Sequence, residues 1–177
     1  EAPAPGLAPA TRAALHQAAR DAARALGYRN AGTCEFLVDP KGRAYFLEVN
    51  RRLQVEHPVT EAIFGIDLVA WQLRVAAGEP LPPEGTWTPR GHAVEARVCA
   101  EDPANGFVPS TGTITALQLP GGPGVRIDGH LYVGQEITLF YDSLLMKLIV
   151  HAPTRDEAIA RLRRALHETR VGGVTTN

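Results

Sequence analysis

Two short runs on either side of a tight-turn sequence restrict the fold of this chain more than any other feature. The runs are residues 32–38 (GTCEFLV) and 43–50 (RAYFLEVN), and residues 39–42 (DPKG) between them have the composition of a turn. Folding the runs about this turn predicts an antiparallel hairpin. In that hairpin Glu35 lies roughly opposite Glu48 on the neighbouring strand.

The second run leads into an unusually polar segment. Side chains alternate between the faces of a strand, so Glu48 and Asn50 point one way while Leu47 and Val49 point into the core. The apolar residues 44–47 (AYFL) therefore predict a buried strand. A row of polar groups is costly to bury, which favours a cleft that holds a metal ion and an anion. If the chain stays extended, three more residues join the polar face: Arg52, Gln54 and Glu56.

The opposed carboxylates predict a cation site. Two carboxylates one strand apart repel each other unless a cation lies between them. Glu35, Glu48 and the amide oxygen of Asn50 are hard ligands that suit Mg²⁺ or Mn²⁺, with nucleotide phosphates completing the coordination shell. The alternative interpretation is that both glutamates are solvated residues on the outer face of the hairpin.

The segment F-L-E-V-N-R-R-L-Q-V-E-H-P-V-T-E resembles the active-site signature of biotin carboxylase, an ATP-grasp enzyme. The usual form in that family is E-M-N-T-R-[IL]-Q-V-E-H-P-V-T-E, so Val49 replaces a Met and Arg51 a Thr, both between the functional positions. The resemblance continues through G-T-x-E-F-L, R-G-H-A-V-E-A-R, A-E-D-P, a Pro-Gly-Gly-x-Gly-Val-Arg run and Y-D-S. It therefore covers nearly the whole chain.

The resemblance implies a fold and a division of the chain. It implies an α+β protein, with the C-terminal part of an ATP-grasp domain over residues 1–78. A truncated, mainly antiparallel biotin carboxylase C-terminal domain with a helix follows over residues 91–177. The proline-rich residues 79–90 are expected to link the two. In the family, the first nucleotide-binding domain, the Gly-rich lid and the phosphate-binding lysines would precede Glu1, and a final segment would follow Asn177.

The resemblance also implies a reaction, in which ATP activates bicarbonate as carboxyphosphate and biotin is carboxylated. Arg52 would clamp the oxyanion, because a guanidinium donates two parallel hydrogen bonds. Glu56 would act as general base on bicarbonate. Arg97 matches the arginine that contacts bicarbonate and biotin and stabilises the biotin enolate. His57 would either orient Glu56 or make a structural hydrogen bond, and Asp142 in the Y-D-S motif is assigned no step.

Further roles follow from the same matches. Two divalent cations would bind at one set of residues, bicarbonate oxygens at a second and the nucleotide at a third, while one arginine matches a dimer-interface position. These sets are Glu35, Glu48 and Asn50 for the cations; Arg52, Gln54, the backbone N–H of Val55, and Arg97 for bicarbonate; Glu35, Leu37, Leu47 and Glu48 for ATP; and Arg126 for the interface. Pro123 stands where the family sometimes has an aromatic residue, which leaves the interface details open.

The expected cofactors and partners are those of a biotin-dependent carboxylase. They are ATP, two Mg²⁺ or Mn²⁺ ions, biotin on a carboxyl carrier protein or domain, a carboxyltransferase component and a second copy in a homodimer. An acyl-CoA carboxylase, such as the acetyl-CoA carboxylase of fatty acid biosynthesis, is the expected parent. The choice between acyl-CoA, pyruvate and urea lies in a carboxyltransferase elsewhere, so these residues do not specify it.

Periodicity predicts the remaining elements. The helices are expected at 11–26, with an Ala-rich face packed closely on the hairpin; after Thr60 as a possible N-cap; at 67–77, with Asp67 as N-cap; and at 154–169, with Thr154 as N-cap. Strands are expected at 92–100, 111–119, 124–127, 135–139 and 144–151, and their short spacing predicts an antiparallel meander. Trp71 and Trp87 are expected to pack near the linker.

Composition excludes several classes of protein. The net charge is −1 and the arginines form no run, so no electrostatic feature favours nucleic acid. No stretch approaches the ~20 apolar residues of a membrane helix, and no signal peptide is visible. Cys34 and Cys99 are not spaced as a metal or redox pair, which predicts two buried thiols in a reducing compartment. The expected location is the cytoplasm, or the mitochondrial matrix in a eukaryote.

Two alternatives to biotin carboxylation stay open. Another ATP-grasp ligase, such as the large subunit of carbamoyl phosphate synthetase, shares the Glu and Glu-x-Asn ligands and also activates bicarbonate. The Q-V-E-H-P-V-T-E continuation and the motif around Arg97 argue against it. The other alternative is that these 177 residues alone form a folded, non-catalytic piece that serves assembly or acts as a scaffold.

Overall fold

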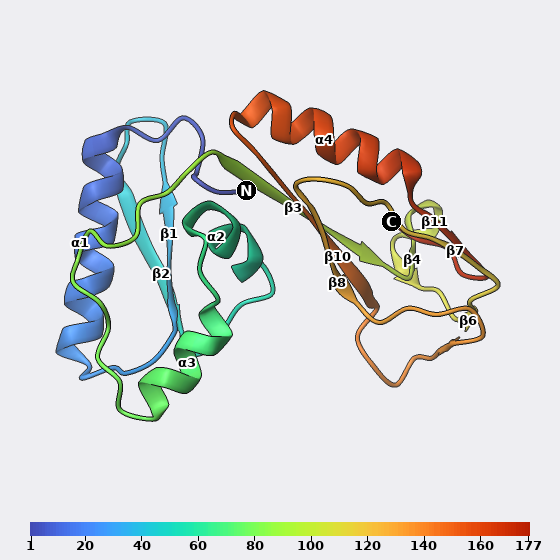
Figure 1. Ribbon diagram of the computed structural model, residues 1–177, viewed down its shortest axis with the longest axis horizontal. Helices are drawn as coiled ribbons and strands as arrows, with labels where there is room; N and C mark the ends of the chain where they lie inside the picture. The colour runs from blue at the N-terminus through green and yellow to red at the C-terminus, as the bar shows by residue number, and fades with distance from the viewer. The chain divides into compact units, whose positions relative to one another are not determined.

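The computed structural model describes residues 1–177, which form two compact units. The hairpin unit is Pro3–Pro89, and the sheet unit is Arg90–Asn177 together with Glu1–Ala2. Helices and antiparallel strand pairs make up both units, so the predicted α+β class is confirmed (Figure 1). None of the helices combines the length and the apolar composition needed to span a membrane.

The hairpin unit contains the predicted hairpin. Strand β1 (Thr33–Val38) pairs antiparallel with β2 (Ala44–Asn50), and Glu35 is the register partner of Glu48, as predicted. Thr33 pairs with Asn50, which puts Asn50 on the same face as the two carboxylates. The register shifts directly after Glu35, where Phe36 pairs with Phe46, so Leu47 is an extra residue that forms a β-bulge.

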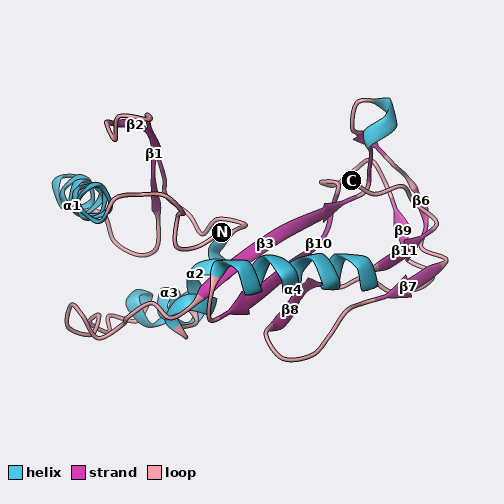
Figure 2. Ribbon diagram, turned by 90° about the horizontal axis from the view of Figure 1, so that it is seen from above, coloured by secondary structure: helices cyan, strands magenta, loops and turns pink.

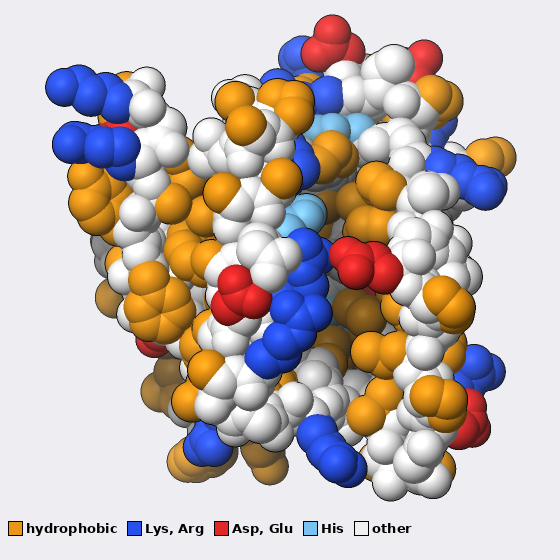
Figure 3. Space-filling view, turned by 90° about the vertical axis from the view of Figure 1, so that its left-hand side faces the viewer, with side chains coloured by type: hydrophobic (Ala, Val, Ile, Leu, Met, Phe, Trp, Pro, Cys, Tyr) orange, Lys and Arg blue, Asp and Glu red, His pale blue; other side chains and the backbone are white.

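The prediction that residues 44–47 form a buried strand is wrong. Tyr45 and Leu47 are about half exposed, and Phe46 is 57% exposed. The sheet has only two strands, and β1–β2 packs against few other residues. Apolar side chains are correspondingly visible at the molecular surface, in orange, among the charged ones (Figure 3). Val49 is only partly covered rather than in a core.

Helix α1 (Pro9–Ala25) begins with a proline at its first turn and is followed by Gly27 in the left-handed conformation. The predicted close packing of its Ala-rich face is wrong, since α1 contains no buried residue. Alanine side chains are too short to fill the space over the hairpin. A groove of about 540 Å³ is left between α1 and the strands, lined by Ala14, Ala18, Phe36 and Phe46 among others.

Two short helices follow the hairpin. Helix α2 (His57–Phe64) ends at Gly65, which adopts the left-handed conformation that favours glycine (φ 65°). The possible N-cap at Thr60 is wrong, because Thr60 lies inside α2. Helix α3 (Leu68–Ala76) has the predicted N-cap, in which Asp67 Oδ1 accepts the Ala70 N–H at 2.7 Å. Trp71 and Trp87, expected to pack near the linker, contact each other edge to face, with ring centroids 5.2 Å apart.

The sheet unit is built on three long antiparallel strands, β3 (His92–Cys99), β10 (Leu144–Ala152) and β8 (Val125–Gly129). Their order is β3-β10-β8, so the predicted meander is wrong although every pairing is antiparallel. The same unit contains three short, two-stranded antiparallel sheets: β4 (Glu101–Asp102) with β5 (Val108–Pro109), β6 (Gly112–Thr113) with β9 (Glu136–Ile137), and β7 (Ala116–Gln118) with β11 (Arg170–Gly172). A 3₁₀ turn lies at Pro103–Asn105.

Helix α4 (Arg155–Glu168) runs along one face of this sheet (Figure 2). Thr154 forms the predicted N-cap and, with Glu157, a full capping box. The core lies between helix and sheet, where Leu148 and Val150 are 0% exposed. The other members of this cluster are Ala152, Ala158 and Ala165, with Val94, Val125, Ile127 and Leu162 packed against it.

The first two residues of the chain belong to the sheet unit. Ala2 forms an antiparallel bridge with Ala93 at the free edge of β3. The Glu1 carboxylate accepts hydrogen bonds from Arg155 Nε at 2.7 Å and Nη2 at 3.0 Å, and it lies 2.8 Å from His92 Nε2. The Arg155 hydrogen bonds, helped by His92, lower the pKa of Glu1 from 4.5 to about 2 against the opposing effect of burial. These contacts fix the segment to β3 and α4.

Candidate functional site

The polar side chains of the hairpin converge on one point. The Asn50 amide nitrogen donates to Glu35 Oε1 at 2.8 Å and to Glu48 Oε1 at 2.9 Å. Both carboxylate oxygens therefore lie within 3 Å of a single nitrogen. The strand register alone brings these three residues together, since Glu35 and Glu48 are direct partners and Asn50 is two residues further along β2.

The loop after β2 completes this cluster by a route that the sequence did not predict. The strand ends at Asn50, so the expectation that extended chain carries Arg52, Gln54 and Glu56 along the polar face is wrong. The loop instead turns back, and Gln54 Nε2 donates to Glu35 Oε1 at 2.7 Å. Arg52 Nη2 reaches Asn50 Oδ1 at 3.5 Å, and its Nη1 reaches the Leu53 carbonyl at 3.3 Å.

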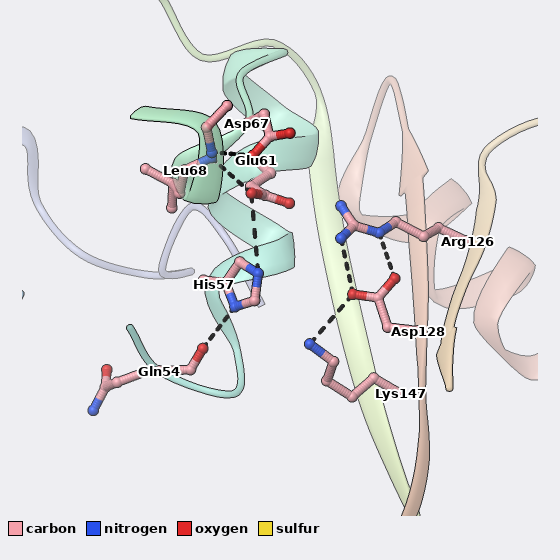
Figure 4. A network of polar contacts seen from close by, with 9 residues as sticks. Gln54, His57, Glu61, Asp67, Leu68, Arg126, Asp128 and Lys147 are labelled. Carbon is pink, nitrogen blue, oxygen red and sulfur yellow. Dashed lines mark hydrogen bonds and ion pairs between the residues drawn. The ribbon is translucent and has the colours of Figure 1, made fainter. Parts of the chain in front are cut away.

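The half-buried His57 and the buried Glu61, both in α2, hold the loop in place (Figure 4). His57 Nδ1 lies 2.7 Å from the Gln54 carbonyl oxygen, and its Nε2 lies 4.0 Å from Glu61 Oε1. Glu61 is 7% exposed and also accepts the Leu68 N–H at 2.8 Å. Sequence reasoning missed Glu61, although its i,i+4 spacing from His57 on a helix was a usable signal. His57 thus fixes the backbone of Gln54, whose side chain contacts Glu35.

This cluster has the donor set of a hard-cation site. No group of three or more His, Cys, Asp or Glu side chains is placed to hold a metal ion, so the candidate site depends on the Glu35–Glu48 pair and an amide. In the structure the Asn50 amide N–H groups lie between the Glu35 and Glu48 carboxylates, and the Gln54 amide N–H groups contact Glu35. A half-turn of the Asn50 amide would present its oxygen instead, and the three oxygens would then suit Mg²⁺.

The other predicted residues of the hairpin unit lie near the cluster in sequence and differ in exposure. Leu37 and Leu47 are both exposed on the strands, and the backbone of Glu56 forms the N-cap of α2 without a side-chain hydrogen bond to the helix. The Glu56 side chain is exposed, and Val55 is half-buried. An exposed carboxylate beside the loop is accessible to a small substrate.

The sheet unit presents a second polar region on the face of β3-β10-β8 opposite α4, which we call the charged face. Alternation puts five charged residues there: Glu95, Arg97, Arg126, Asp128 and Lys147. Asp128 Oδ1 accepts Arg126 Nε at 2.7 Å, Oδ2 accepts Arg126 Nη2 at 2.8 Å, and Lys147 Nζ lies 3.3 Å from Oδ2 (Figure 4). Arg97 is exposed and is the register partner of Lys147.

Two family models divide the chain between them. The model described as "Carbamoyl-phosphate synthase L chain, ATP binding domain" matches residues 1–84, and the one described as "Biotin carboxylase C-terminal domain" matches residues 95–177. A biotin carboxylase of Halalkalibacterium halodurans is 52% identical over 178 residues, covering 100% of this chain and 39% of that protein. The chain belongs to the biotin carboxylase family.

Other members of the biotin carboxylase family agree with this assignment. The alpha subunit of mitochondrial methylcrotonoyl-CoA carboxylase from Rattus norvegicus is 48% identical over 179 residues, covering 100% of this chain and 25% of that protein. The solved biotin carboxylase domain dimer of the Hydrogenobacter thermophilus 2-oxoglutarate carboxylase, in complex with MgADP, ADP and bicarbonate, has 47% identity and a TM-score of 0.95. It is matched over 99% of this chain and 39% of that chain.

The chain spans 33% to 40% of the length of the first curated biotin carboxylases that it matches. Within this span the structure brings Glu35, Glu48, Asn50, Arg52 and Gln54 into one hydrogen-bonded cluster. Of the predicted residues outside the hairpin unit, Arg97 and Arg126 share the charged face of the sheet unit.

Two other features noted in the sequence have structural roles. Asp142 Oδ1 accepts the Leu144 N–H at 2.8 Å and so shapes the turn into β10. Cys34 and Cys99 are unpaired, and both are half-buried rather than buried. Burial, with the nearby Glu101 charge, raises the pKa of the Cys99 thiol. A raised pKa disfavours the reactive thiolate at Cys99.

Proposed function

We propose that this chain forms part of the catalytic centre of an ATP-dependent biotin carboxylase. In the proposed reaction, bicarbonate attacks the γ-phosphate of ATP, giving ADP and carboxyphosphate. Carboxyphosphate then splits into phosphate and carbon dioxide, and the carbon dioxide carboxylates the ureido nitrogen of biotin, whose proton passes to the leaving phosphate. The cluster of Glu35, Glu48, Asn50, Arg52 and Gln54, built from the family's signature, is the observation that carries the proposal.

In this proposal the hairpin unit binds the nucleotide. Glu35, Glu48 and Asn50 would hold two divalent cations, and the exposed Leu37 and Leu47 would lie beside the nucleotide. The cations would neutralise phosphate charge. Mg²⁺ is favoured over Mn²⁺ because the Hydrogenobacter thermophilus domain is in complex with MgADP. The protein's own contribution is to keep two carboxylates pointed at one position, which the strand register achieves.

The loop after β2 would handle bicarbonate. Arg52 donates to planar oxyanions in a fork geometry, and its guanidinium lies beside Asn50. Gln54 and the backbone N–H of Val55 would bind the remaining oxygens. Glu56, with an exposed carboxylate at the start of α2, would accept the bicarbonate proton. The bound anion in the Hydrogenobacter thermophilus domain is bicarbonate, which agrees with this assignment.

Arg97 would act on biotin from the charged face of the sheet unit. Its guanidinium would contact bicarbonate and biotin and stabilise the enolate that develops on the ureido group. Carbon dioxide and biotin must meet within about 3–3.5 Å for reaction. We therefore propose that Arg97 holds biotin within reach of carbon dioxide in the full-length enzyme.

The finer assignments are also proposals. Residues 1–78 would be the ATP-grasp part and residues 91–177 the C-terminal domain, joined by 79–90. A biotin carboxyl carrier and a carboxyltransferase would be partners, with Arg126 at a homodimer interface, and a dimer is the form named for the Hydrogenobacter thermophilus domain. An acyl-CoA is the favoured final acceptor, since a methylcrotonoyl-CoA carboxylase subunit is among the relatives.

The test is ATP turnover by the full-length product of the gene that encodes this chain. Phosphate release should depend on bicarbonate and rise when free biotin is added. Glu56→Gln should abolish the biotin-dependent part, while Glu79→Gln, on the linker, serves as the matched control. A full-length protein with no bicarbonate-dependent ATP turnover in the presence of biotin would contradict the proposed function.

Carbamoyl phosphate synthesis is the second candidate, favoured by the family model that matches residues 1–84. The same assay separates the two, because ammonia rather than biotin would then stimulate turnover. The match of residues 95–177 to the biotin carboxylase C-terminal domain favours biotin.

We propose that the 177 residues alone are inactive and form a folded, non-catalytic piece. They span 33% to 40% of the matched biotin carboxylases, so most of the length of those proteins has no counterpart in them. Isothermal titration of the 177-residue chain with ATP·Mg should show weak binding at best. Robust biotin-dependent ATP hydrolysis by this chain would contradict the proposal.

A further inference from the structure

Lys147 occupies a position on the charged face that sequence reasoning did not single out. It lies in β10 directly opposite Arg97 in β3, and opposite Asp128 in β8 on its other side. Directly opposed residues of an antiparallel pair have Cβ atoms about 4.5–5.5 Å apart. Arg97, Lys147 and Asp128 thus form one row across the sheet, with the lysine in the middle.

The lysine is held firmly in this row. Its side chain is 13% exposed, and its ammonium lies 3.3 Å from Asp128 Oδ2. Arg126 donates to both oxygens of the same carboxylate. Burial by itself raises the pKa of Asp128, but the hydrogen bonds and charges of Arg126 and Lys147 outweigh it, and the pKa of Asp128 is lowered. Asp128 is therefore ionised at neutral pH.

The arrangement of charges in this row is unfavourable in itself. Two cations directly opposite each other on neighbouring strands are destabilising. An arginine two strands from an ionised carboxylate is attracted to it, because a guanidinium and a carboxylate form strong, charge-assisted hydrogen bonds. Here both Asp128 oxygens already accept hydrogen bonds from Arg126, and Lys147 stands between the carboxylate and Arg97. The positive charge of Lys147 repels the guanidinium of Arg97 from that side.

We propose that Lys147 is a positioning residue for Arg97: it keeps the Arg97 guanidinium from closing onto Asp128 and so directs it toward the anionic substrate. The inference rests on the proposed function, in which Arg97 acts on biotin. Asp128 and Arg126 have a supporting role, since they fix the ammonium of Lys147 on the sheet. Lys147 itself need not touch the substrate.

A merely structural salt bridge makes a different prediction. If Lys147 only stabilises the sheet, then Lys147→Gln lowers the thermal midpoint and impairs the biotin and ATP parameters alike, and the double variant shows no recovery that is specific to the kcat/KM for biotin. If Lys147 shields Arg97 from Asp128, then removing Asp128 as well takes away the competing carboxylate. The double variant separates the two interpretations.

The experiment uses the full-length protein with free biotin, and it compares Lys147→Gln, Lys147→Arg, Asp128→Asn and the double variant Lys147→Gln/Asp128→Asn. The kcat/KM for biotin should fall roughly ten- to a hundredfold in Lys147→Gln, as expected when a reacting group is misplaced. The KM for ATP should stay unchanged. Lys147→Arg should keep most of the activity, because the positive charge stays in the row. The double variant should regain most of what Lys147→Gln loses.

Several outcomes would overturn the inference. One is a Lys147→Gln protein with normal kcat/KM for biotin. Another is a double variant no better than Lys147→Gln, and a third is a parallel loss in biotin and ATP parameters together with a lower thermal midpoint. If Lys147→Gln does not fold, two other variants test the inference. Normal activity of Lys147→Arg together with a folded but inactive Lys147→Met would support the positioning role. A folded and active Lys147→Met would contradict it. A wild-type protein without biotin-dependent turnover would contradict the proposed function itself. This result is distinguishable from a failure of the positioning role, which would leave the wild-type turnover normal.

Discussion

Leu37 and Leu148 both occupy the interior of a β-strand, yet Leu37 is 59% exposed and Leu148 is 0% exposed. Leu37 belongs to a two-stranded sheet in the hairpin unit, and Leu148 to the middle strand of a sheet covered by α4 in the sheet unit. The difference affects how each unit positions its polar residues. The charged face lies on the back of a packed core, whereas Glu35 and Glu48 are held mainly by register and by amide hydrogen bonds.

The polar residues of the two units therefore have different sources of rigidity. Packing fixes Arg97 and Lys147, because a buried strand cannot shift its register without exposing its core. Local polar contacts fix Gln54 and Asn50, and these contacts exchange easily with ligands or water. A cation and an anion can therefore rearrange the hairpin cluster more readily than the charged face.

The largest expected effect tests the difference in packing directly. Leu148→Ala should lower the free energy of unfolding by roughly 2–5 kcal/mol, because it leaves a cavity. The matched change Leu37→Ala should cost about 0.5 kcal/mol or less, as an exposed substitution. Urea unfolding of the 177-residue chain, followed by far-UV circular dichroism, measures both. Equal losses would show that the two units are packed alike.

The same titration can separate the units, since both tryptophans, Trp71 and Trp87, lie in the hairpin unit. Leu148→Ala should move the circular dichroism transition more than the tryptophan fluorescence transition. A single coincident transition for both signals would mean that the two units unfold together.

The second prediction compares the two arginines, one from each unit, that are proposed to act in catalysis. In the full-length protein, Arg97→Ala should reduce biotin carboxylation by roughly 10²–10³, or about 2.7–4 kcal/mol, while the KM for ATP changes little. Arg52→Ala should also reduce bicarbonate-dependent ATP turnover in the absence of biotin. Steady-state kinetics with each substrate varied in turn checks both, and normal carboxylation by Arg97→Ala would remove it from the site.

The third prediction concerns helix starts. Thr154→Ala removes the capping box of α4 and should cost about 1 kcal/mol of unfolding free energy. Thr60→Ala is the matched control, because Thr60 lies inside α2 and caps nothing. Its effect should be within about 0.5 kcal/mol, since alanine is the better helix former. A loss at Thr60 as large as that at Thr154 would contradict the assignment of the two caps.

The smallest expected effect is a pH dependence. The pKa of Glu1 is lowered from 4.5 to about 2, so the folded state favours its charged form. The stability that it contributes is present in full above about pH 4.5 and is lost as the pH falls through about 2. Urea midpoints of the sheet unit, measured between pH 5 and pH 2, should fall less steeply in Glu1→Gln than in the unchanged chain.

Asp39 in the hairpin unit provides the control for this measurement. The pKa of Asp39 is also lowered, first by the hydrogen bond from the Arg43 backbone N–H and then by the Arg43 side chain. Both contacts lie within the turn of the β1–β2 hairpin, so they do not involve the sheet unit. Asp39→Asn should leave the midpoint of the sheet unit unchanged at every pH. A flatter pH dependence of the sheet-unit midpoint in Asp39→Asn than in Glu1→Gln would reverse the proposed importance of the two carboxylates.

The sequence by itself determined the features that depend on local spacing. Strand alternation and the turn at residues 39–42 were enough to pair Glu35 with Glu48, and cap chemistry placed Thr154 and Asp67 correctly. The ordered motifs were enough to indicate the biotin carboxylase family. These inferences succeeded because each depends on neighbours along the chain or across a single turn.

Only the tertiary structure decided how residues distant along the chain come together. The loop turns back to bring Gln54 to Glu35 because His57 and Glu61 anchor it, and no periodicity shows a loop reversal. The strand order β3-β10-β8 places Lys147 between Arg97 and Asp128, which a meander would not do. Burial of residues 44–47 failed as a prediction because an apolar strand is buried only when other elements cover it. Alternation specifies which side chains share a face, and the packing of distant elements decides what that face meets.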